Sequence, residues 1–595
     1  MKITPTSLTL NQLFSSANEQ FVIPAYQRRY SWRERQLYEL IEDIELLENS
    51  DVHLLGSIVC LTGHHTAGIN RLELVDGQQR LTTICILLEC LRERLIAGDE
   101  ADQAQALGRL LTAKASGGKA MPKIALDSID GDEYRQLVDN ANGDDHSQYQ
   151  NQHLVAAFAI IRQWIEDQDL TLLGGFLYKL QNQALIIRLD VNDAKDAFKL
   201  FETINNRGLK LSPTDIIKNF VLGNAARFDA DQLEEARKSW ALLIAHLDGT
   251  DTDAFFRYFL ISATQRRITK SQVVPEFKTL FMNEVVEAEG LSDRHLYADE
   301  EEADDDEPDE SSDVEDVPIE REGSPQVTFK EFLRRVVTSA EAFGELVLIR
   351  TGRKRIDRHL RNLRMIKSAQ TYGFLMHLRV GGVDDKTFIE VLKLTENFVL
   401  RRHVCRERAN ETESLFAKLC AANPERPLLE VKAAYQEACP TDEKFRHEFA
   451  NANFTSNIID RARYCLEQIE LRRHGSHAEL QILGSDDVHV EHIIPRKIKT
   501  RRAKEEFGDW VNYLGDRVDL LHPRMVSRIG NLTLFAGALN IGASNNPFAS
   551  KKKAYRESAI MITQDLAGMS AFKFKQVEAR SSELADLAVS RWPIP

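Results

Sequence analysis

The sequence predicts a mixed, predominantly helical protein with an α/β domain at its N-terminus and a small β-β-α domain at its C-terminus. Short β-rich runs alternate with helical spacing up to about residue 98, and helical periodicity then dominates residues 150–290 and 328–480. From residue 488 the pattern changes to a short strand, long loops and turns rich in Gly and Asn. A chain of 595 residues is too long for one core, so we expect several domains.

Residues 1–225 are predicted to form the α/β domain, and residues 226–297 to extend it with helices. Ser212 is placed to cap a helix whose first residue is Pro213, because a Ser side chain accepts from free backbone N–H groups and proline tolerates that position. The remaining elements follow from periodicity: we expect strands at 21–23, 55–61, 72–75 and 185–189, and helices at 32–48 and 79–95.

Residues 298–325 are predicted to be an acidic linker. The formal net charge of the chain is −15, but residues 299–320 contain 14 Asp and Glu and no Lys or Arg, which leaves −1 for the rest. Self-repulsion and the scarcity of apolar side chains favour disorder in such a segment. A solvated spacer and a nucleic-acid mimic that shields a basic groove are both consistent with it.

Residues 326–484 are predicted to be a helical domain that carries two basic clusters. Residues 353–367 hold seven Lys and Arg against one Asp, at near-helical intervals. The second cluster comprises Arg401, Arg402, Arg406 and Arg408. Contact with a DNA backbone and an ordinary charged helix face remain alternatives for both clusters.

Several classes of protein are disfavoured by composition. No run approaches the ~20 apolar residues of a membrane-spanning helix, and we see no secretion signal. The seven cysteines form no CxxC pair, which is typical of free thiols in a reducing cytoplasm. No GxxxxGK[ST] motif is present, so a P-loop NTPase is not expected. We therefore expect a cytoplasmic protein without a membrane partner.

Three polar motifs mark the N-terminal domain. The first is IPAYQRRYSW from residue 23, the second is VDGQQRLTT from residue 75, and the third is FETINNRGLKLSPTDIIK from residue 201. In the second motif a strand ends, Gly77 permits a tight turn and a helix follows, so that free N–H groups at the helix start suit a phosphate. Arg80 adds a bidentate donor, and Asp76 is placed to hold a metal ion or orient water.

In this order the three motifs closely resemble the N-terminal domain of the GmrSD restriction endonuclease family, which is distantly similar to ParB-type and sulfiredoxin-like folds. The resemblance covers roughly residues 1–225 and implies that this domain binds and hydrolyses a nucleoside triphosphate. Carried over, the nucleotide site comprises Tyr26, Gln27, Arg28, Asp76, Gly77, Gln78, Gln79, Arg80, Asn206, Arg207 and Lys218.

A fourth motif lies near the C-terminus. Glu491-His492 is followed by Pro495, then by Gly530-Asn531-Leu532, and a further Asn540 lies nine residues after Asn531. Hydrolysis of a phosphodiester needs a base for water and a cation to offset developing charge. Successive residues of a strand point to opposite faces, so a bend at 493–495 is needed to bring Glu491 and His492 to one centre.

This combination resembles the ββα-metal, or HNH, nuclease signature, and most resembles the C-terminal domain of GmrSD-type proteins over about residues 485–575. By analogy His492 is the general base, Asn531 orients the site, and Glu491 and Asn540 bind Mg²⁺ or Mn²⁺. The third signature position offers no histidine, so the second metal ligand is open among Asn540, Asn545 and Asn546. For Lys551–Lys553, phosphate contact and surface solvation are equal alternatives.

The resemblance implies a single-chain, BrxU-like type IV restriction endonuclease that cleaves modified phage DNA, with hydroxymethylated or glucosylated cytosine as examples. An NTP would regulate cleavage, double-stranded DNA and nucleotide would be its partners, and a homodimer is expected. Two alternatives remain: an SspE-like enzyme whose nicking depends on phosphorothioate, and a nucleotide-regulated toxin or RNase.

Overall fold

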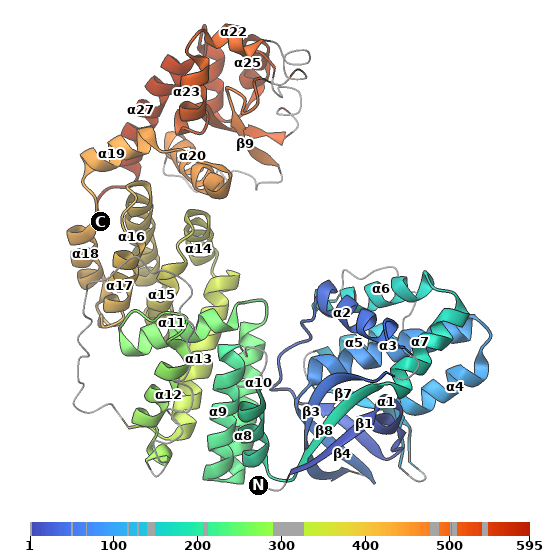
Figure 1. The fold of residues 1–595 in the computed structure, drawn as a ribbon. Helices are drawn as coiled ribbons and strands as arrows, with labels where there is room; N and C mark the ends of the chain where they lie inside the picture. The colour runs from blue at the N-terminus through green and yellow to red at the C-terminus, as the bar shows by residue number, and fades with distance from the viewer. Residues whose placement is uncertain are drawn as a thin grey trace. The chain divides into compact units, whose positions relative to one another are not determined.

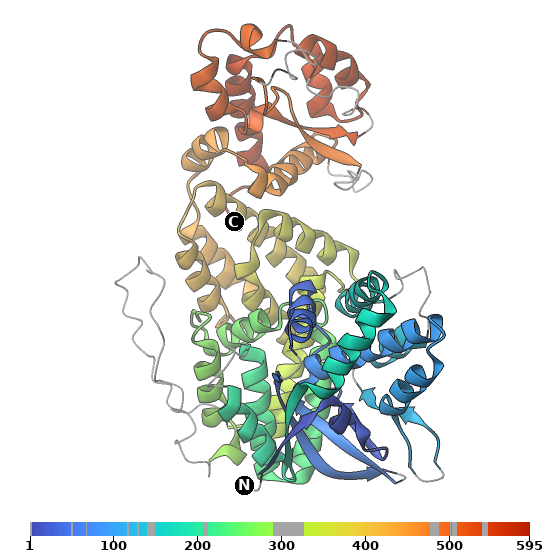
Figure 2. The ribbon, with the colours of Figure 1, turned by 45° about the vertical axis from the view of Figure 1, so that its right-hand side comes forward.

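The computed structural model of the chain divides into two compact units. The first contains residues 1–257 and 269–341, and the second contains residues 258–268 and 342–595 (Figures 1 and 2). The acidic linker expected at 298–325 lies outside the described residues. The structure describes residues 3–48, 51–66, 68–115, 118–127, 130–139, 149–205, 212–289, 326–475, 487–499, 501, 509–537, 539 and 546–595.

A six-stranded mixed sheet organises the first unit, in the order β1-β8-β3-β4-β2-β7. Strands β3 and β8 are parallel, as are β2 with β4 and β2 with β7, while β1–β8 and β3–β4 are antiparallel. The strands are β1 (Ile3–Thr9), β2 (Glu19–Ile23), β3 (His53–Thr66), β4 (Ile69–Asp76), β7 (Ile124–Leu126) and β8 (Ala184–Val191), and β5 (Thr112–Ala113) pairs separately with β6 (Met121–Pro122).

Helices α2 to α7 gather on one side of this sheet (Figure 1). Helix α3 is buried on most of its circumference because its sequence is apolar on nearly every face, and it carries the centre of the core. The helices are α1 (Leu10–Ser15), α2 (Glu34–Glu45), α3 (Gln78–Ala97), α4 (Ala101–Leu110), α5 (Asp130–Asp139), α6 (Gln152–Glu166) and α7 (Leu170–Asn182).

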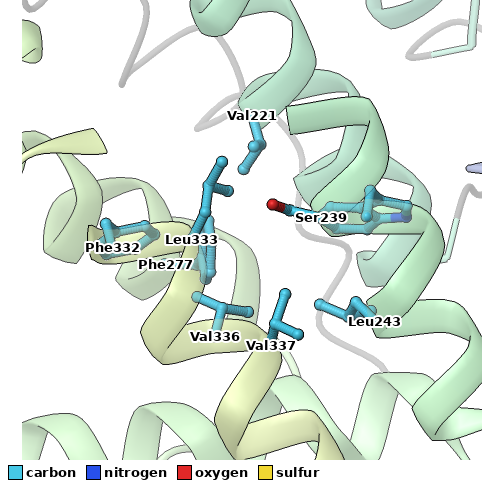
Figure 3. Close-up of a pocket in the computed structure, with 9 residues that line it drawn as sticks. Val221, Ser239, Leu243, Phe277, Phe332, Leu333, Val336 and Val337 are labelled. Atoms are coloured by element: carbon cyan, nitrogen blue, oxygen red, sulfur yellow. The ribbon is translucent and has the colours of Figure 1, made fainter. Parts of the chain in front are cut away.

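The chain continues through further helices: α8 (Ala194–Asn205), α9 (Pro213–Phe228), α10 (Ala230–Leu247), α11 (Thr252–Thr264), α12 (Val273–Glu284), η1 (Val286–Ala288) and α13 (Phe329–Leu348). A cavity of about 10 Å³ lies among Val221, Trp240, Phe277 and Val336 (Figure 3). Its lining is almost entirely apolar, and its volume is at the lower limit for a single water. We interpret it as a packing defect in the helical core.

The second unit begins with a helical array: α14 (Lys354–Ile366), η3 (Ala369–Thr371), α15 (Tyr372–Val380), α16 (Asp385–Val404), α17 (Ala409–Leu419), α18 (Pro427–Ala438), α19 (Asp442–Asn451), η4 (Ser456–Ile458) and α20 (Ile459–Arg473). Strands β9 (Val488–His492) and β10 (Leu532–Ala536) then form a two-stranded antiparallel sheet. Around it lie α22 (Trp510–Leu514), α23 (Val518–Met525), η5 (Ile529–Asn531), α25 (Phe548–Glu557), α26 (Met561–Gln564), η6 (Asp565–Gly568) and α27 (Phe574–Arg591).

The predicted fold class, mostly helical with an N-terminal mixed sheet, is confirmed. The capping prediction holds as well, since Ser212 accepts from the Asp215 N–H and Pro213 opens α9. Strand β1 was missed, because its four threonine and serine positions and Pro5 hide the β pattern. Among the described residues, no helix is long and apolar enough to span a membrane.

One part of the basic-cluster prediction is wrong. Arg401 and Arg402 do not form a charged surface, because both side chains are buried. The Arg401 guanidinium donates to the carbonyl oxygens of Trp592 and Pro440, at 2.9 and 2.8 Å. Arg402 donates to Thr412 Oγ1 and to the Ala438 carbonyl. These two arginines hold the helical array together and are not presented to a phosphate backbone.

Candidate nucleotide site and candidate nuclease site

The turn between β4 and α3 is built around Gly77. Its φ is +87°, in the left-handed region that favours glycine, and it is the N-cap of α3. A Cβ at this position would lie 2.6 Å from Ile58 Cγ2 and 3.1 Å from the Ser57 carbonyl oxygen. Glycine is therefore required both by the backbone conformation and by the close approach of β3. Asp76, the last residue of β4, immediately precedes Gly77, the N-cap of α3.

Helix α9 brings Lys218 to this turn through Gln27. The Gln27 amide nitrogen donates to the carbonyl oxygens of Leu74 and Val75, at 3.1 and 3.0 Å. Its oxygen accepts from Lys218 Nζ at 2.6 Å. Gln27 thereby bonds the first motif to the end of β4, where the second motif begins. The buried Lys218 of the third motif is in turn bonded to Gln27.

Arg28, Asp76, Asp215 and Lys218 form a cluster of charged groups beside this turn, and each affects the charge of its neighbours. Lys218 Nζ lies 3.6 Å from an oxygen of Asp215, and Arg28 Nε lies 4.0 Å from the other oxygen. Burial lowers the pKa of Lys218, and Asp215 and Asp76 oppose that shift. Burial favours a raised pKa for Asp215, but Lys218 and Arg28 hold it below its usual value. The cluster combines two basic groups with two carboxylates beside a helix N-terminus, and the free backbone N–H groups of helix N-termini favour anions in general.

Other residues of the second motif have structural partners. The Gln79 amide accepts from the Ser31 N–H at 2.8 Å and donates to the Arg29 carbonyl at 3.1 Å, so it fastens the first motif to α3. Arg80 donates to the Ser57 carbonyl, and its guanidinium packs against Gly56. Gln78 differs, since its buried Oε1 has no hydrogen-bond partner in the described part of the chain.

Tyr26 is buried and turned towards the sheet. Its hydroxyl donates to Glu73 Oε1 at 2.5 Å, and the Arg237 guanidinium lies 5.7 Å from its ring centroid. Burial raises the pKa of Tyr26 well above its ordinary value, and Glu73 adds to that shift. Its side chain therefore supports the loop that carries Gln27 and Arg28.

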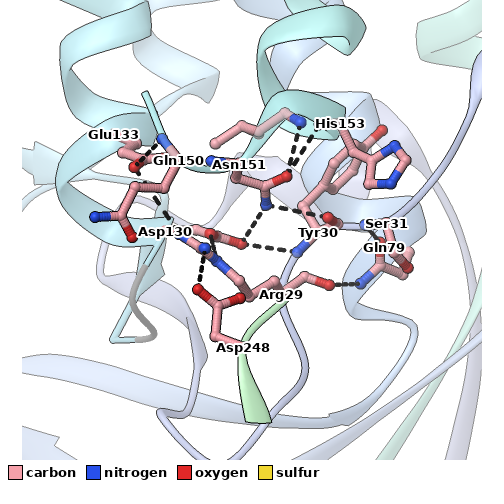
Figure 4. Close-up of polar contacts among 11 residues, drawn as sticks. Arg29, Tyr30, Ser31, Gln79, Asp130, Glu133, Gln150, Asn151, His153 and Asp248 are labelled. Atoms are coloured by element: carbon pink, nitrogen blue, oxygen red, sulfur yellow. Dashed lines mark hydrogen bonds and ion pairs between the residues drawn. The ribbon is translucent and has the colours of Figure 1, made fainter. Parts of the chain in front are cut away.

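A buried carboxylate that the sequence did not single out holds the same loop (Figure 4). Asp130 accepts from Arg29 Nε and from the Tyr30 N–H, both at 2.7 Å, and from Asn151 Nδ2 at 2.9 Å. Arg29 also pairs with Asp248 at 2.7 Å. No local pattern marks Asp130, because all its partners come from distant segments. Of the predicted nucleotide residues, Asn206 and Arg207 lie outside the described residues.

The nuclease motif folds as two antiparallel strands, in which His492 pairs with Leu532 and Glu491 with Thr533. Asn531, fully buried, clamps the bend that follows His492. Its Oδ1 accepts from the Ile494 N–H at 2.8 Å. Its Nδ2 donates to the Ile494 carbonyl at 2.9 Å and to the Val526 carbonyl at 2.8 Å. This geometry makes Asn531 a positioning residue at the bend that the motif requires.

Lys551 from α25 lies beneath this bend, completing a β-β-α arrangement. Its ammonium is fully buried and donates to Glu491 Oε1 at 2.5 Å, to the His492 carbonyl at 3.2 Å and to the Ile493 carbonyl at 3.3 Å. Burial raises the pKa of Glu491 and lowers that of Lys551, and each partner opposes the shift of the other. Surface solvation, one alternative for Lys551, is therefore excluded.

The burial of Lys551 has a signal in the sequence. Phe548, Lys551 and Tyr555 occupy positions i, i+3 and i+7 of one helix face, and all three are buried. Lys553, two residues further on, is exposed. Helical periodicity therefore distinguishes Lys551, which is buried, from the exposed Lys553 in the same run of three lysines.

His492 is partly buried beside other cationic groups. Burial, together with Arg496, Lys551 and His522, lowers the pKa of His492 to about 4. Its imidazole is therefore neutral near pH 7 and has a lone pair available for a proton. His522 lies close by and contacts the Pro495 carbonyl oxygen through Nε2 at 2.8 Å. The sequence motif did not indicate His522, because it lies 30 residues from His492 on another element.

The nuclease signature implies a divalent cation. The metal-ligating side chains near Glu491 and His492 show whether such a cation fits. Among the described residues, no group of three or more His, Cys, Asp and Glu side chains converges on one point. Glu491 supplies a hard carboxylate next to His492 in the strand, and Lys551 holds a positive charge against it. Mg²⁺ needs only one or two carboxylates and retains water, so this donor chemistry fits. The expected second ligand, Asn540, lies outside the described residues.

The chain thus carries a β-β-α unit with Glu491 and His492 near its C-terminal end and an α/β domain near its N-terminal end. Comparison with known families agrees at both ends. Residues 10–222 match the N-terminal domain of GmrSD restriction endonucleases, and residues 439–587 match their C-terminal domain. The chain belongs to the GmrSD restriction endonuclease family. No curated protein matches it.

Proposed function

We propose that this protein is a type IV restriction endonuclease that cleaves modified phage DNA, such as DNA with hydroxymethylated or glucosylated cytosine. One observation carries the proposal: Asn531 and Lys551 preorganise the bend around Glu491 and His492 within a GmrSD C-terminal domain. A site held this firmly by buried hydrogen bonds suits chemistry, because catalytic groups need fixed geometry.

In the proposed reaction His492 is the general base. Its neutral imidazole accepts a proton from water, the water oxygen bonds to phosphorus, and the bond from phosphorus to one sugar oxygen breaks. That oxygen leaves with the bonding electron pair and takes a proton from solvent. Asn531 keeps the His492 end of β9 in place through Ile494, so its role is to position the base.

Glu491 and Asn540 would hold the divalent metal, Mg²⁺ or Mn²⁺. When bound, the metal supplies positive charge near the phosphate and the leaving oxygen. Lys551 orients the Glu491 carboxylate and anchors the backbone on either side of it through the carbonyls of His492 and Ile493. These contacts fix the carboxylate before any ligand arrives.

The N-terminal cluster is proposed to bind a nucleoside triphosphate that regulates cleavage. The start of α3 after Gly77 presents backbone N–H groups, and Arg28 and Lys218 add positive charge beside it. Asp76 is proposed to orient water or a cation at the phosphates, and Asn206 and Arg207 to complete the site. Within the described residues the buried Gln78 Oε1 has no hydrogen-bond partner, which supports a polar ligand at this turn.

The test is cleavage of plasmid and phage DNA in the presence of Mg²⁺ or Mn²⁺, with and without each NTP. Substrates are unmodified, hydroxymethylated, glucosylated and phosphorothioated DNA. The variants are His492→Ala and, as a matched control, His489→Ala, which removes an exposed histidine from the same strand. We expect nucleotide-dependent cutting of one modified DNA, lost in His492→Ala and retained in His489→Ala.

Other outcomes would redirect the assignment. Nicking only of phosphorothioated DNA would identify an SspE-like enzyme, and cutting of RNA but not DNA would identify a toxin or RNase. Cutting that survives His492→Ala would remove the proposed base from the mechanism.

A further inference from the structure

Helix α14 presents a strongly basic face to solvent. Its apolar residues, among them Ile356, Leu360 and Leu363, are buried against the rest of the second unit. The basic residues in and beside the helix are all exposed: Arg353, Lys354, Arg355, Arg358, Arg361, Arg364 and Lys367. We call Lys354, Arg355, Arg358 and Arg361 the α14 basic face.

Within the described residues, the α14 basic face has no ion-pair partner. The other basic side chains nearby are engaged: Arg353 pairs with Asp385 at 2.6 Å, and Arg364 and Lys367 donate to backbone carbonyls. Asp357, the acidic residue of the helix, is bonded instead to Thr351 Oγ1 at 2.7 Å. The four remaining charges are therefore available to an external anion.

Such an arrangement is unfavourable for the free helix. Lys354 and Arg358 are four residues apart and Arg358 and Arg361 are three apart, spacings at which like charges repel and destabilise a helix. The chain as a whole is acidic, so its composition does not account for this concentration of positive charge. Arg401 and Arg402, by contrast, use their guanidinium groups as internal donors. The charged groups of the α14 basic face are instead exposed to solvent.

The underside of α14 is fastened by a buried polar network. Glu396 of α16 is hydrogen-bonded to His359 Nδ1, and its other oxygen accepts from Asn362 at 3.1 Å and from the Tyr464 hydroxyl at 2.9 Å. Trp592 Nε1 donates in turn to that hydroxyl at 3.0 Å. The network joins α14 to α16, α20 and the end of the chain, so the basic face has a fixed orientation.

Helix α20 continues the connection to the nuclease strands. Arg463, the residue before Tyr464, donates to the Val488 carbonyl at the start of β9. Glu470, two turns further on, accepts from the N–H groups of Met561 at 2.7 Å and Ile562 at 3.0 Å. Helix α20 thus bonds both to the Glu396 network beneath α14 and to the strand that carries Glu491 and His492.

We propose that the α14 basic face binds the phosphate backbone of DNA and holds the duplex relative to the nuclease site through α20. From Lys354 to Arg361 the face spans about 10 Å of helix, and a duplex presents one phosphate charge about every 1.7 Å of its axis. Several phosphates therefore lie within reach of the four side chains. This inference rests on the proposed function in taking DNA as the ligand, and it adds where the backbone binds.

The test measures binding without cleavage. Fluorescence anisotropy of an unmodified 30-base-pair duplex is recorded with the full chain in EDTA, between 50 and 200 mM salt. In the variant Arg355→Gln/Arg358→Gln/Arg361→Gln we expect affinity at 100 mM salt to fall about 10- to 100-fold, because three counterion-releasing contacts are lost. The slope of log K against log salt should decrease in magnitude by about 0.9 for each contact.

The matched control is Lys418→Gln/Arg426→Gln/Lys432→Gln, which removes the same charge from exposed positions of the same unit. We expect it to change affinity less than about 2-fold, and neither variant to unfold below the wild-type temperature. Equal effects of the two variants, an unchanged affinity in the α14 variant, or no binding by the wild type would each overturn the inference. Since no cleavage is needed, a protein that cuts no DNA but loses binding in the α14 variant would contradict the proposed function alone.

Discussion

The buried pair of Lys551 and Glu491 gives the sharpest test of the nuclease site. Lys551→Met keeps much of the side-chain volume but removes the ammonium that contacts Glu491 and two carbonyls. Loss of one partner of a buried ion pair costs about 3–5 kcal/mol, because the other charge is left uncompensated. At about 2–4 °C per kcal/mol, the second unit should unfold roughly 6–20 °C lower.

The assay is differential scanning calorimetry of the full chain for Lys551→Met, Glu491→Gln and the double variant, with Lys553→Met as the control. Lys553 is exposed on the same helix, so its removal should change stability by less than about 0.5 kcal/mol. The double variant should be destabilised by less than the sum of the singles, with an interaction of about 1–3 kcal/mol. Additive effects, or a Lys551→Met no less stable than Lys553→Met, would refute the buried pair.

Three other predictions concern the positioning role of Asn531, the backbone conformation at Gly77 and the titration of His403. Asn531→Ala removes hydrogen bonds from three backbone groups, two of them buried, and should cost about 3 kcal/mol. The kcat should fall while DNA affinity in EDTA is retained, and loss of that affinity would contradict a purely positioning role. Gly77→Ala places a Cβ 2.6 Å from Ile58 at positive φ and should cost about 2–4 kcal/mol and weaken NTP binding; calorimetry and nucleotide titration measure both. Burial, with Arg461, lowers the pKa of His403 from 6.5 to about 4, so the folded state binds fewer protons than the unfolded state in that interval. Stability should decrease as pH falls from 6.5 to 4, by up to about 3 kcal/mol, and His403→Gln should reduce that loss in urea unfolding; an unchanged pH profile would show that this histidine titrates normally.

The local features of this protein could be predicted from its sequence. Ser212 and Pro213 define a helix start by themselves, because capping involves groups only a few residues apart. Gly77 in a strand-turn-helix motif is a local signal of the same kind. The family resemblance likewise depends on short ordered motifs, and the matches over 10–222 and 439–587 confirm it.

The partners of the buried charges were decided by the tertiary structure. Lys218 bonds to Gln27 across 191 residues, and Lys551 to Glu491 across 60. Arg401 appeared as part of a basic surface, but packing buries it. A charged side chain is stable inside a protein only where acceptors from several elements converge, and that convergence depends on the packing of distant segments. Local periodicity therefore predicted most of the main elements of this chain, whereas the environments of its buried charges followed only from how those elements pack.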